Sequence, residues 1–496
     1  MSMPARLRRL AFLAHRWLGI GGCVLMLLWF GSGIVMLYVG YPKLTPAERL
    51  ARLPPLDPAD CCVGLRALPP PADGAVLTSV RGRPAYVLGT RTYAGDTGAP
   101  EPATSPALAL AAARAFSPGA SPRLDGRIVE DRWTHSGGLN PHRPLYRVQV
   151  DAPEPATLYV SSATGQVVLD APLAQQRWNY VGAWLHWLYL FRNRPADPVW
   201  TWLVIALSGA CTLVAASGVL VGIWRWRFRG RYKSGSRSPY REPWMRWHHI
   251  LGLVFSLCTC TWIFSGLMSM NPGGVFAAPA PAPDRVAYAG PAGDAPRPDD
   301  PRPVLAALRA AGFAPVELRW RRLGGESYVL AYDAHGDSRI VRAGPRGPRI
   351  TRHWQPEEVL PAAAALFPGW RWRSTVLTDY DAYYYGRHEA AMNGGAPRGL
   401  PALRLAGDNG VLAYIDLRSG DPVLILSPSQ RVGRWLFYFL HSWDLPPLLR
   451  AATLRDVLLI LLSAGGILLS ATGCVIGWRR LRTKAAARHP PGPRRA

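Results

Sequence analysis

Four long apolar runs stand out from an otherwise mixed pattern of hydrophobic and polar positions along the 496-residue chain. Each run is near the roughly 20 residues that a helix needs to cross the hydrocarbon of a bilayer. None contains Lys, Arg, Asp or Glu in its interior, whereas a buried helix of a soluble protein usually keeps a polar face. The pattern predicts four unbroken transmembrane helices, at residues 18–39, 199–224, 250–270 and 457–478.

The two long segments between these runs have a different pattern. In each, short helices are followed by stretches that alternate apolar and polar residues, which is typical of an α+β module with antiparallel strands. The Pro-rich stretches at 42–73 and 271–303 are predicted linkers, the second flexible. Predicted helices lie at 107–116, 304–311 and 357–367, and predicted strands at 76–80, 85–89, 127–133, 145–150, 157–160, 167–169, 316–321, 328–333, 339–341, 371–379, 403–405, 411–416 and 422–426.

The chain also repeats itself, since two sets of residues recur with identical spacing. This repetition predicts that a two-helix half has been duplicated, and that each half carries two histidines at the edges of its membrane helices. The first set is His15, Gly19, Trp29, Ser32 and Gly33, which match His248, Gly252, Trp262, Ser265 and Gly266. The second set is His186, Gly218 and Gly222, which match His441, Gly473 and Gly477.

Basic residues set the expected orientation and account for the net charge of +25. They crowd the N-terminus, the 225–246 loop and the tail from Arg479, and short basic loops stay in the cytoplasm. Both termini and this loop are therefore expected inside, with the two long segments outside. Because much of the charge flanks membrane helices, topology and anionic lipid explain it better than nucleic acid, which we do not expect as a partner.

Only Cys61 and Cys62 lie outside the spans. We expect free thiols or an intermolecular bridge there, because a bond between neighbouring cysteines is strained.

The predicted domains follow from these elements. The predicted organisation is 1–40, N-terminus and first helix; 41–176, first outer region; 177–225, outer histidine helix and second helix; 226–247, cytoplasmic loop; 248–270, third helix; 271–430, second outer region; 431–479, outer histidine helix and fourth helix; 480–496, cytoplasmic tail.

The four repeated histidines are the candidate cofactor ligands. A histidine at a membrane helix suggests a function, because burying an ionisable group there needs a compensating partner. Two neutral imidazoles are the usual axial ligands of a b-type haem suited to electron transfer. The topology pairs His15 with His248 at the cytoplasmic edge and His186 with His441 at the outer edge, which predicts two haems. His249 is a possible substitute for His248.

A plainer interpretation applies to each histidine taken alone. A histidine beside a tryptophan at a helix end is more often an ordinary interfacial residue. Duplication without haem could also preserve the pattern. The joint placement of four histidines at two matching depths is what favours haem over these alternatives.

Several motifs resemble one known family. They are His15-Arg16-Trp17-Leu18-Gly19, a strand ending in Tyr414-Ile415-Asp416, the helix before His441, and a last span that closes on Gly477-Trp478-Arg479-Arg480. Together they resemble the PepSY-associated transmembrane proteins over nearly the whole chain. The resemblance implies α+β PepSY-like modules outside a bacterial inner membrane. It also implies, as in some members, a ferric-siderophore reductase with haem in a four-helix core.

Other chemistry leaves no signal in the sequence. We find no Gly-x-Gly-x-x-Gly fingerprint, P-loop or Gly-x-Ser-x-Gly elbow, and the loop histidines lack zinc-ligand spacing. We assign no catalytic side chain, and the electron donor is expected to be external, either quinol or a cytoplasmic reductase. The segment 379–388 could line an outer pocket, although a strand packing aromatic residues against the membrane surface is the simpler expectation.

Two further functions compete with a ferric-siderophore reductase. One is a non-enzymatic membrane protein whose PepSY modules bind or restrain a partner such as a protease, which would have no use for four paired histidines. The other is a transporter, which is disfavoured because the repeats run parallel and the expected spans are unbroken and free of midplane charge.

Overall fold

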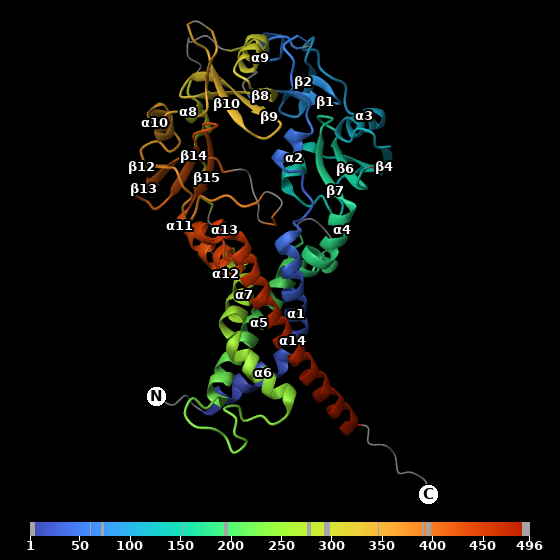
Figure 1. Ribbon diagram of the computed structural model, residues 1–496, viewed down its shortest axis with the longest axis vertical. Coiled ribbons are helices and arrows are strands. Elements are labelled where there is room, and N and C mark those ends of the chain that lie inside the picture. The colour runs from blue at the N-terminus through green and yellow to red at the C-terminus, as the bar shows by residue number, and fades with distance from the viewer. Residues whose placement is uncertain are drawn as a thin grey trace. The chain divides into compact units, whose positions relative to one another are not determined.

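The computed structural model describes residues 5–488 except 60, 71–73, 152, 193–196, 275–278, 292–297, 346, 389–390 and 393–397. The chain forms two compact units (Figure 1). The first comprises Met1–Gly40, Trp178–Ala278 and Ser429–Ala496, and the second comprises Tyr41–Arg177 and Pro279–Pro428.

The first unit is a bundle of long apolar helices. Three helices in the described residues are long and apolar enough to cross a membrane: α1 (Ala5–Tyr38), α5 (Pro198–Arg225) and α14 (Ala452–Arg488). The expected unbroken third span is instead two helices, α6 (Pro243–Val254) and α7 (Ser256–Ser269), which meet at an angle of 72°. The prediction of an unbroken helix at 250–270 is therefore wrong.

Phe255 lies at the break between α6 and α7. Its ring packs against α14 at Gly465, where an added Cβ atom would lie only 2.2 Å from the Phe255 ring. Such a contact is far inside the van der Waals limit, so only glycine can stand there while the ring stays in place. The bend and the glycine therefore belong to one packing arrangement.

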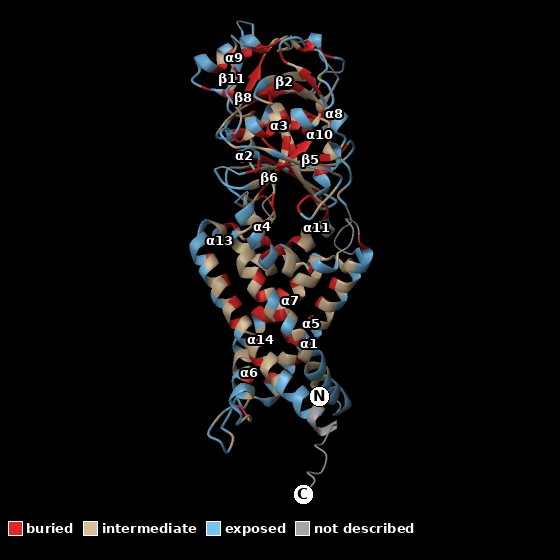
Figure 2. Cartoon of the chain, turned by 90° about the vertical axis from the view of Figure 1, so that its right-hand side faces the viewer, coloured by how far each residue is buried: buried red, intermediate tan, exposed pale blue. Residues whose placement is uncertain are grey.

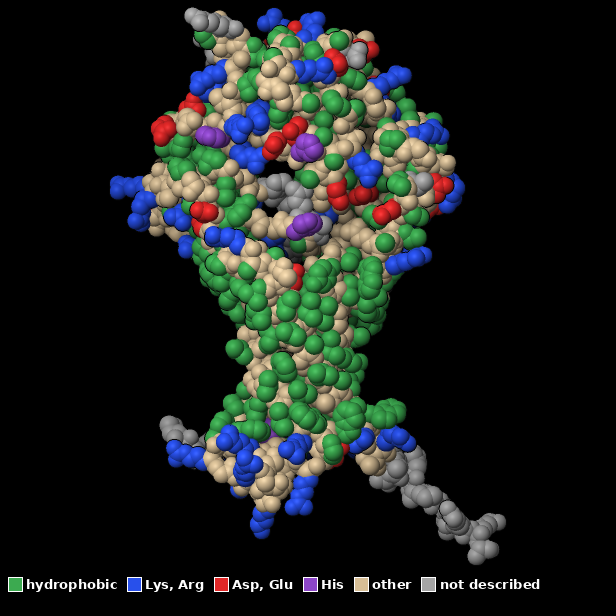
Figure 3. Space-filling model, viewed as in Figure 1, with side chains coloured by type: hydrophobic (Ala, Val, Ile, Leu, Met, Phe, Trp, Pro, Cys, Tyr) green, Lys and Arg blue, Asp and Glu red, His purple; other side chains and the backbone are tan. Residues whose placement is uncertain are grey.

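Apolar side chains from all four parts of the bundle form its core. Figure 2 shows the buried residues along the facing sides of these helices. Figure 3 shows hydrophobic side chains over the outer surface of the helices, with Lys and Arg gathered at the end where α6 lies. This distribution is that of a membrane protein. The core includes Met26 and Phe30 of α1, Cys211 and Val214 of α5, Cys258 and Trp262 of α7, and Leu459 of α14.

The second unit is built on a seven-stranded sheet to which both outer segments contribute. Its order is β11-β10-β9-β8-β1-β2-β3, and β1 pairs with β8 through Val76↔Arg319 and Leu77↔Leu318. The two outer regions, which we expected to fold as separate modules, therefore share one sheet. The strands are β1 (Val76–Val80), β2 (Arg83–Leu88), β3 (Arg91–Ala94), β8 (Pro315–Leu323), β9 (Glu326–Asp333), β10 (Ser338–Arg342) and β11 (Arg349–Thr351).

Two further sheets, each of four antiparallel strands, complete this unit. Helix α3 (Pro106–Phe116) packs its alanines against the first sheet, and α10 (Pro356–Ala365) packs against the second. The first sheet is β4 (Arg123–Ile128), β5 (Leu145–Val150), β6 (Ala156–Ser161) and β7 (Val167–Pro172). The second is β12 (Trp372–Leu377), β13 (Ala402–Gly407), β14 (Leu412–Asp416) and β15 (Asp421–Leu426).

Short helices occur where we expected irregular linkers. Helix α2 (Pro46–Ala51) begins with a capping box in which Thr45 and Glu48 bond each other's backbone amides. The expected linker at 271–303 contains α8 (Arg285–Ala289) and the first three residues of α9. The remaining short helices are η1 (Leu65–Ala67), η2 (Gly137–His142), α4 (Leu173–Asn179), η3 (Tyr180–Trp184), η4 (Tyr189–Phe191), η5 (Pro272–Gly274), α9 (Pro301–Ala310), α11 (Pro428–Gly433), η6 (Arg434–Phe439), α12 (Leu440–Ser442) and α13 (Pro446–Arg450).

The cysteines fall into two groups. Cys61 and Cys62 form a disulfide and are both buried in the core of the seven-stranded sheet. This differs from our expectation of free thiols or an intermolecular bridge. The five other cysteines are free and lie in the helical unit, where most are buried as packing residues.

Candidate functional site

The four repeated histidines meet in two pairs within the helical unit. His15 of α1 faces His248 of α6, with ring centroids 6.2 Å apart and an angle of 37° between the ring planes. His186, which follows η3, faces His441 of α12, with ring centroids 6.0 Å apart and ring planes at 77°. We call these the first and the second histidine pair. Each pair takes one histidine from each half of the chain.

The second pair is held by unusual backbone in both halves. A π-helical segment, η3 or η6, comes shortly before each histidine. Two residues after each histidine, Leu188 (φ 53°) and Trp443 (φ 50°) adopt left-handed backbone that side chains other than glycine rarely adopt. Wide helical turns and strained residues concentrate at functional sites, where the surrounding fold must offset about 1–3 kcal/mol for each strained residue.

The loop after each of these histidines is tied to the next long helix. The Trp200 Nε1–H donates to the carbonyl of Trp187 at 2.9 Å. At the matching place in the second half, the Arg455 guanidinium donates to the carbonyl of Ser442 at 2.6 and 3.0 Å. The carbonyl of the residue after each histidine is therefore bonded to the next long helix in both halves, through a tryptophan in one half and an arginine in the other.

Each of the four histidines has a polar contact at Nδ1. In the second pair, Nδ1 of His186 lies 3.0 Å from the Ser32 hydroxyl, and Nδ1 of His441 lies 3.0 Å from the Ser265 hydroxyl. In the first pair, Nδ1 of His248 lies 3.0 Å from the Thr472 hydroxyl. The fourth contact differs, because Nδ1 of His15 lies 3.1 Å from the carbonyl oxygen of Val214.

These contacts favour one position for the proton on each ring. Each hydroxyl already donates its only proton to a carbonyl of its own helix: Ser32 to Leu28 at 2.6 Å, Ser265 to Trp262 at 3.0 Å and Thr472 to Leu469 at 2.6 Å. A hydroxyl that donates to its own helix can accept from Nδ1–H of the histidine, and a carbonyl oxygen can only accept. The contacts therefore favour the tautomer that carries its proton on Nδ1, in which Nε2 can bind a metal.

Repeated glycines leave room for the imidazole rings. An added Cβ atom would lie 2.7 Å from Cε1 of His15 at Gly218, and 3.4 Å from Cε1 of His248 at Gly473. At Gly33 and Gly266, the distance to Cε1 of His186 and of His441 would be 3.8 Å. The repeated spacing between histidine and glycine therefore corresponds to direct contact.

His249 is turned away from the first pair. Its Nδ1 lies 2.8 Å from the Ser238 hydroxyl, and its Nε2 lies 2.9 Å from the carbonyl oxygen of Gly222. The edges of Trp226 and Tyr240 also contact its ring. Because both nitrogens are engaged, this buried side chain anchors the end of α5 to the following loop, and the geometry gives it no role as a substitute for His248.

The geometry of the pairs fits a metal bound between two imidazoles. A metal–nitrogen bond is about 2.0 Å long and a ring centroid lies about 1.1 Å behind its nitrogen, so two axial imidazoles have centroids about 6 Å apart. Two aromatic rings in ordinary contact can have the same centroid separation. An ordinary contact would not explain why all four rings also have a polar contact at Nδ1. Among the described residues, no group of three or more His, Cys, Asp or Glu side chains could hold a metal, so two protein ligands suit a haem better than zinc.

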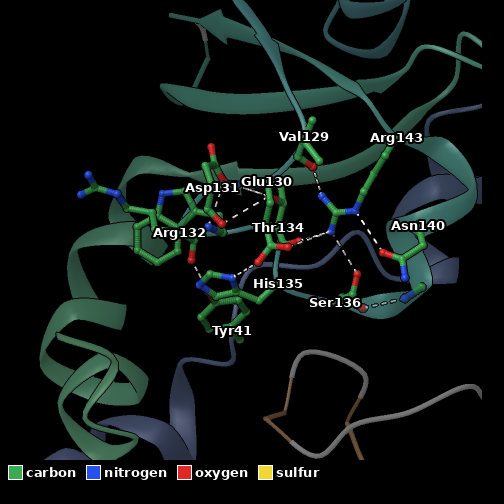
Figure 4. A network of polar contacts seen from close by, with 12 residues as sticks. Tyr41, Val129, Glu130, Asp131, Arg132, Thr134, His135, Ser136, Asn140 and Arg143 are labelled. Atoms are coloured by element: carbon green, nitrogen blue, oxygen red, sulfur yellow. Dashed lines mark hydrogen bonds and ion pairs between the residues drawn. The ribbon is translucent and has the colours of Figure 1, made fainter. Parts of the chain in front are cut away.

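The second unit carries a repeated polar cluster on its two four-stranded sheets. On the first sheet, the Tyr159 hydroxyl donates to Asp131 at 2.8 Å and Arg147 lies 3.4 Å from the same carboxylate. Burial raises the pKa of Tyr159, and the nearby Asp131 charge raises it further. Figure 4 shows the adjoining loop, in which Arg143 reaches backbone carbonyls and His135 contacts Glu130.

The second sheet repeats this cluster with the Tyr-rich segment. The Tyr414 hydroxyl donates to Asp381 at 2.9 Å, and Arg404 lies 3.3 Å from the same carboxylate. Tyr384 is fully buried and stacks on Tyr414 with centroids 5.1 Å apart. The expectation of a strand at 379–388 is wrong, since the segment is an irregular loop fixed to β13 and β14.

Sequence reasoning found the four histidines but missed the hydroxyls that hold them. Ser32 and Ser265 recur in the repeat, and Thr472 precedes a repeated glycine. Their positions in the repeat could therefore have identified them as partners of the histidines. The π-helical turns and the left-handed residues left no recognisable signal.

One protein family, described as the PepSY-associated TM region, matches residues 12–481, which is most of the chain. A comparison with curated proteins found no match.

Proposed function

The chain belongs to the PepSY-associated TM family, and from this premise we propose that it carries electrons across a bacterial inner membrane to a ferric siderophore. In this proposal, the bent pair α6 and α7 acts as the third of four spans in a duplicated fold. The basic segments lie in the cytoplasm together with both termini, and the second unit lies in the periplasm.

The observation that supports this proposal best is the geometry of the two histidine pairs. Both pairs have centroid separations of about 6 Å, the spacing of two imidazoles on one metal, and every ring has a polar contact at Nδ1. Ionisable side chains inside an apolar bundle call for a compensating partner. His15 with His248, and His186 with His441, would each hold one b-type haem.

The distance between the pairs suits a path across the bilayer. His15 and Ser32, which bonds His186, are 17 residues apart on α1, and a helix rises about 1.5 Å per residue, so the pairs lie about 25 Å apart along the helix. When bound, each haem supplies an iron that accepts and gives up one electron at a time. The four histidines would bind the two irons, and the apolar side chains of the bundle would surround both sites.

The electron donor and the acceptor lie outside this chain. The donor is an external quinol or a cytoplasmic reductase, and the acceptor is a ferric chelate in the periplasm.

The test is a reduced-minus-oxidised visible spectrum of the full chain in detergent, with haem measured per chain. We expect two haems per chain, His248→Ala to remove one, and His441→Ala to remove the other. His249→Ala is the matched control and should keep both haems.

A featureless spectrum from folded protein expressed with ample haem would contradict the proposal. The remaining candidate would then be a non-enzymatic membrane protein whose PepSY-like unit binds a partner such as a protease.

A further inference from the structure

We propose that Ser32, Ser265 and Thr472 are positioning residues that set the reduction potentials of the two sites separately. The inference rests on the proposed function, because it assigns these residues to the two haem sites. Ser32 and Ser265 act on the second histidine pair, and Thr472 acts on the first.

The three hydroxyls are buried and reach across elements. Ser32 on α1 is 3% exposed, Ser265 on α7 is fully buried, and Thr472 on α14 is 7% exposed. Each turns back to a carbonyl of its own helix, as serine and threonine in membrane helices commonly do. Each also contacts Nδ1 of a histidine on a different element of the same half. A hydroxyl that only satisfies its own helix would have no such contact.

Such a contact acts on the iron through its ligand. An imidazole whose Nδ1–H donates a hydrogen bond is a stronger base at Nε2, and a more basic ligand stabilises the ferric state. Removing the hydroxyl takes away an acceptor that orients the ring and makes Nε2 more basic. The site should then be easier to reduce, so its potential should rise.

The two sites differ in how many of these contacts depend on side chains. In the second pair, both histidines donate to serine hydroxyls. In the first pair, only His248 donates to a side chain, because His15 donates to the Val214 carbonyl, which no side-chain substitution removes. Changes at the second site can therefore move both ligands, whereas changes at the first site leave one ligand fixed.

The experiment is an optical redox titration of the full chain in detergent, with each haem assigned beforehand by His248→Ala and His441→Ala. Ser32→Ala and Ser265→Ala should each raise the potential of the second site alone. Thr472→Val, which keeps the side-chain volume, should raise that of the first alone. At a fixed applied potential near the midpoint, we expect about a tenfold fall in the ratio of oxidised to reduced haem at the affected site.

Matched controls are available in the same helices. Thr212→Val on α5 and Ser269→Ala on α7 remove hydroxyls that donate only to their own helices, and these changes should leave both potentials unchanged. The conservative variants Thr472→Ser and Ser32→Thr should restore the wild-type values, which a loss of packing would not explain.

Two results would overturn the inference. One is haem-loaded variants with unchanged potentials, and the other is equal shifts at both sites in variants and controls alike. Either result would leave the proposed function intact, whereas a wild-type chain that binds no haem would overturn both proposals.

Discussion

At the scale of single residues, the space around each imidazole is set by glycine. Gly218 is the tightest case, because an added methyl group would lie 2.7 Å from Cε1 and 3.0 Å from Nδ1 of His15. The ring has little freedom to yield, since its Nδ1 is bonded to Val214 on the same helix. The glycine therefore fixes where His15 can stand opposite His248.

Gly218→Ala should displace His15 and remove haem from the first site while the second site keeps its own. The matched control is Gly209→Ala on the same helix, where an added methyl group meets nothing within 4 Å. That control should keep both haems and gain up to about 1 kcal/mol of helix stability. Haem per chain and the thermal unfolding midpoint are the measurements, and two haems bound to Gly218→Ala would contradict the argument.

Asp170 on β7 should make the second unit less stable as the pH rises. Burial raises the pKa of this carboxyl to about 6, with Glu48 adding to the effect and Arg52 opposing it. Because the folded-state pKa lies above the unfolded value near 4, the contribution is full below pH 4 and is lost as the pH rises through 6. The loss should reach about 2–3 kcal/mol.

Asp170→Asn tests this, since an amide does not titrate. Between pH 4 and 7, thermal unfolding of the variant should depend less on pH than that of the wild type, and the variant should be the more stable of the two at pH 7. Parallel pH profiles for both proteins would rule out the assignment.

At the scale of elements, the break between α6 and α7 distinguishes the two halves. In the repeat alignment, the counterparts of Phe255 and Gly465 are Gly22 and Ala210. The first half therefore has small residues at both positions, and the half with the bulky ring on its first helix is the half with the 72° bend. We infer that the Phe255 ring and its glycine partner stabilise the bend.

A double-mutant cycle can test this coupling. Gly465→Ala alone should destabilise the bundle by about 1–3 kcal/mol, because its methyl group overlaps the Phe255 ring. The same change in a Phe255→Ala background should cost little, since the ring is gone and alanine favours the helix. Thermal unfolding gives the stability of the wild type, the two single variants and the double variant. Additive effects would show that the two positions are not coupled.

The sequence predicted most elements because their patterns are local. Strands such as β1 and β5 have the predicted bounds, since alternation and flanking turns specify them directly. Strands β3 and β11, which are four and three residues long, were missed. The bend at Phe255 could not be predicted, because the Phe255 ring packs against Gly465 on α14, more than 200 residues away in the sequence.

In the candidate site too, local sequence patterns predicted some features, while others depended on tertiary contacts. Repeat spacing identified the histidines and glycines, because duplication leaves a regular trace in the sequence. The Nδ1 partners required knowledge of which helix faces meet, and the orientation of His249 depended on the folded loop after α5. The pairing of β1 with β8 also could not be predicted, because each outer segment by itself has the pattern of a complete α+β module.

At the scale of the whole molecule, the two halves of the chain depend on each other. Each histidine pair takes one member from each half. In the second unit, β1 of the first half continues the sheet that begins with β11 of the second half. The buried Glu317 carboxylate of β8 bonds Arg49 of the first half at 2.6 and 2.9 Å, so a charged contact also joins the halves.

This arrangement predicts how a divided chain would behave. If the protein is cut at the exposed Ser234 in the basic loop, each half keeps two histidines that belong to different pairs. Either half expressed alone should bind no bis-histidine haem, because each site would offer only one ligand. Coexpressed halves should assemble through the shared sheet and the bundle and recover about two haems per complex, measured by co-purification and the reduced visible spectrum. His15→Ala in one half should lower the yield to one haem, as His248→Ala in the other half should. A single half that binds a low-spin haem by itself would mean that the ligands pair within a half, and the geometry of both sites would then need a different explanation.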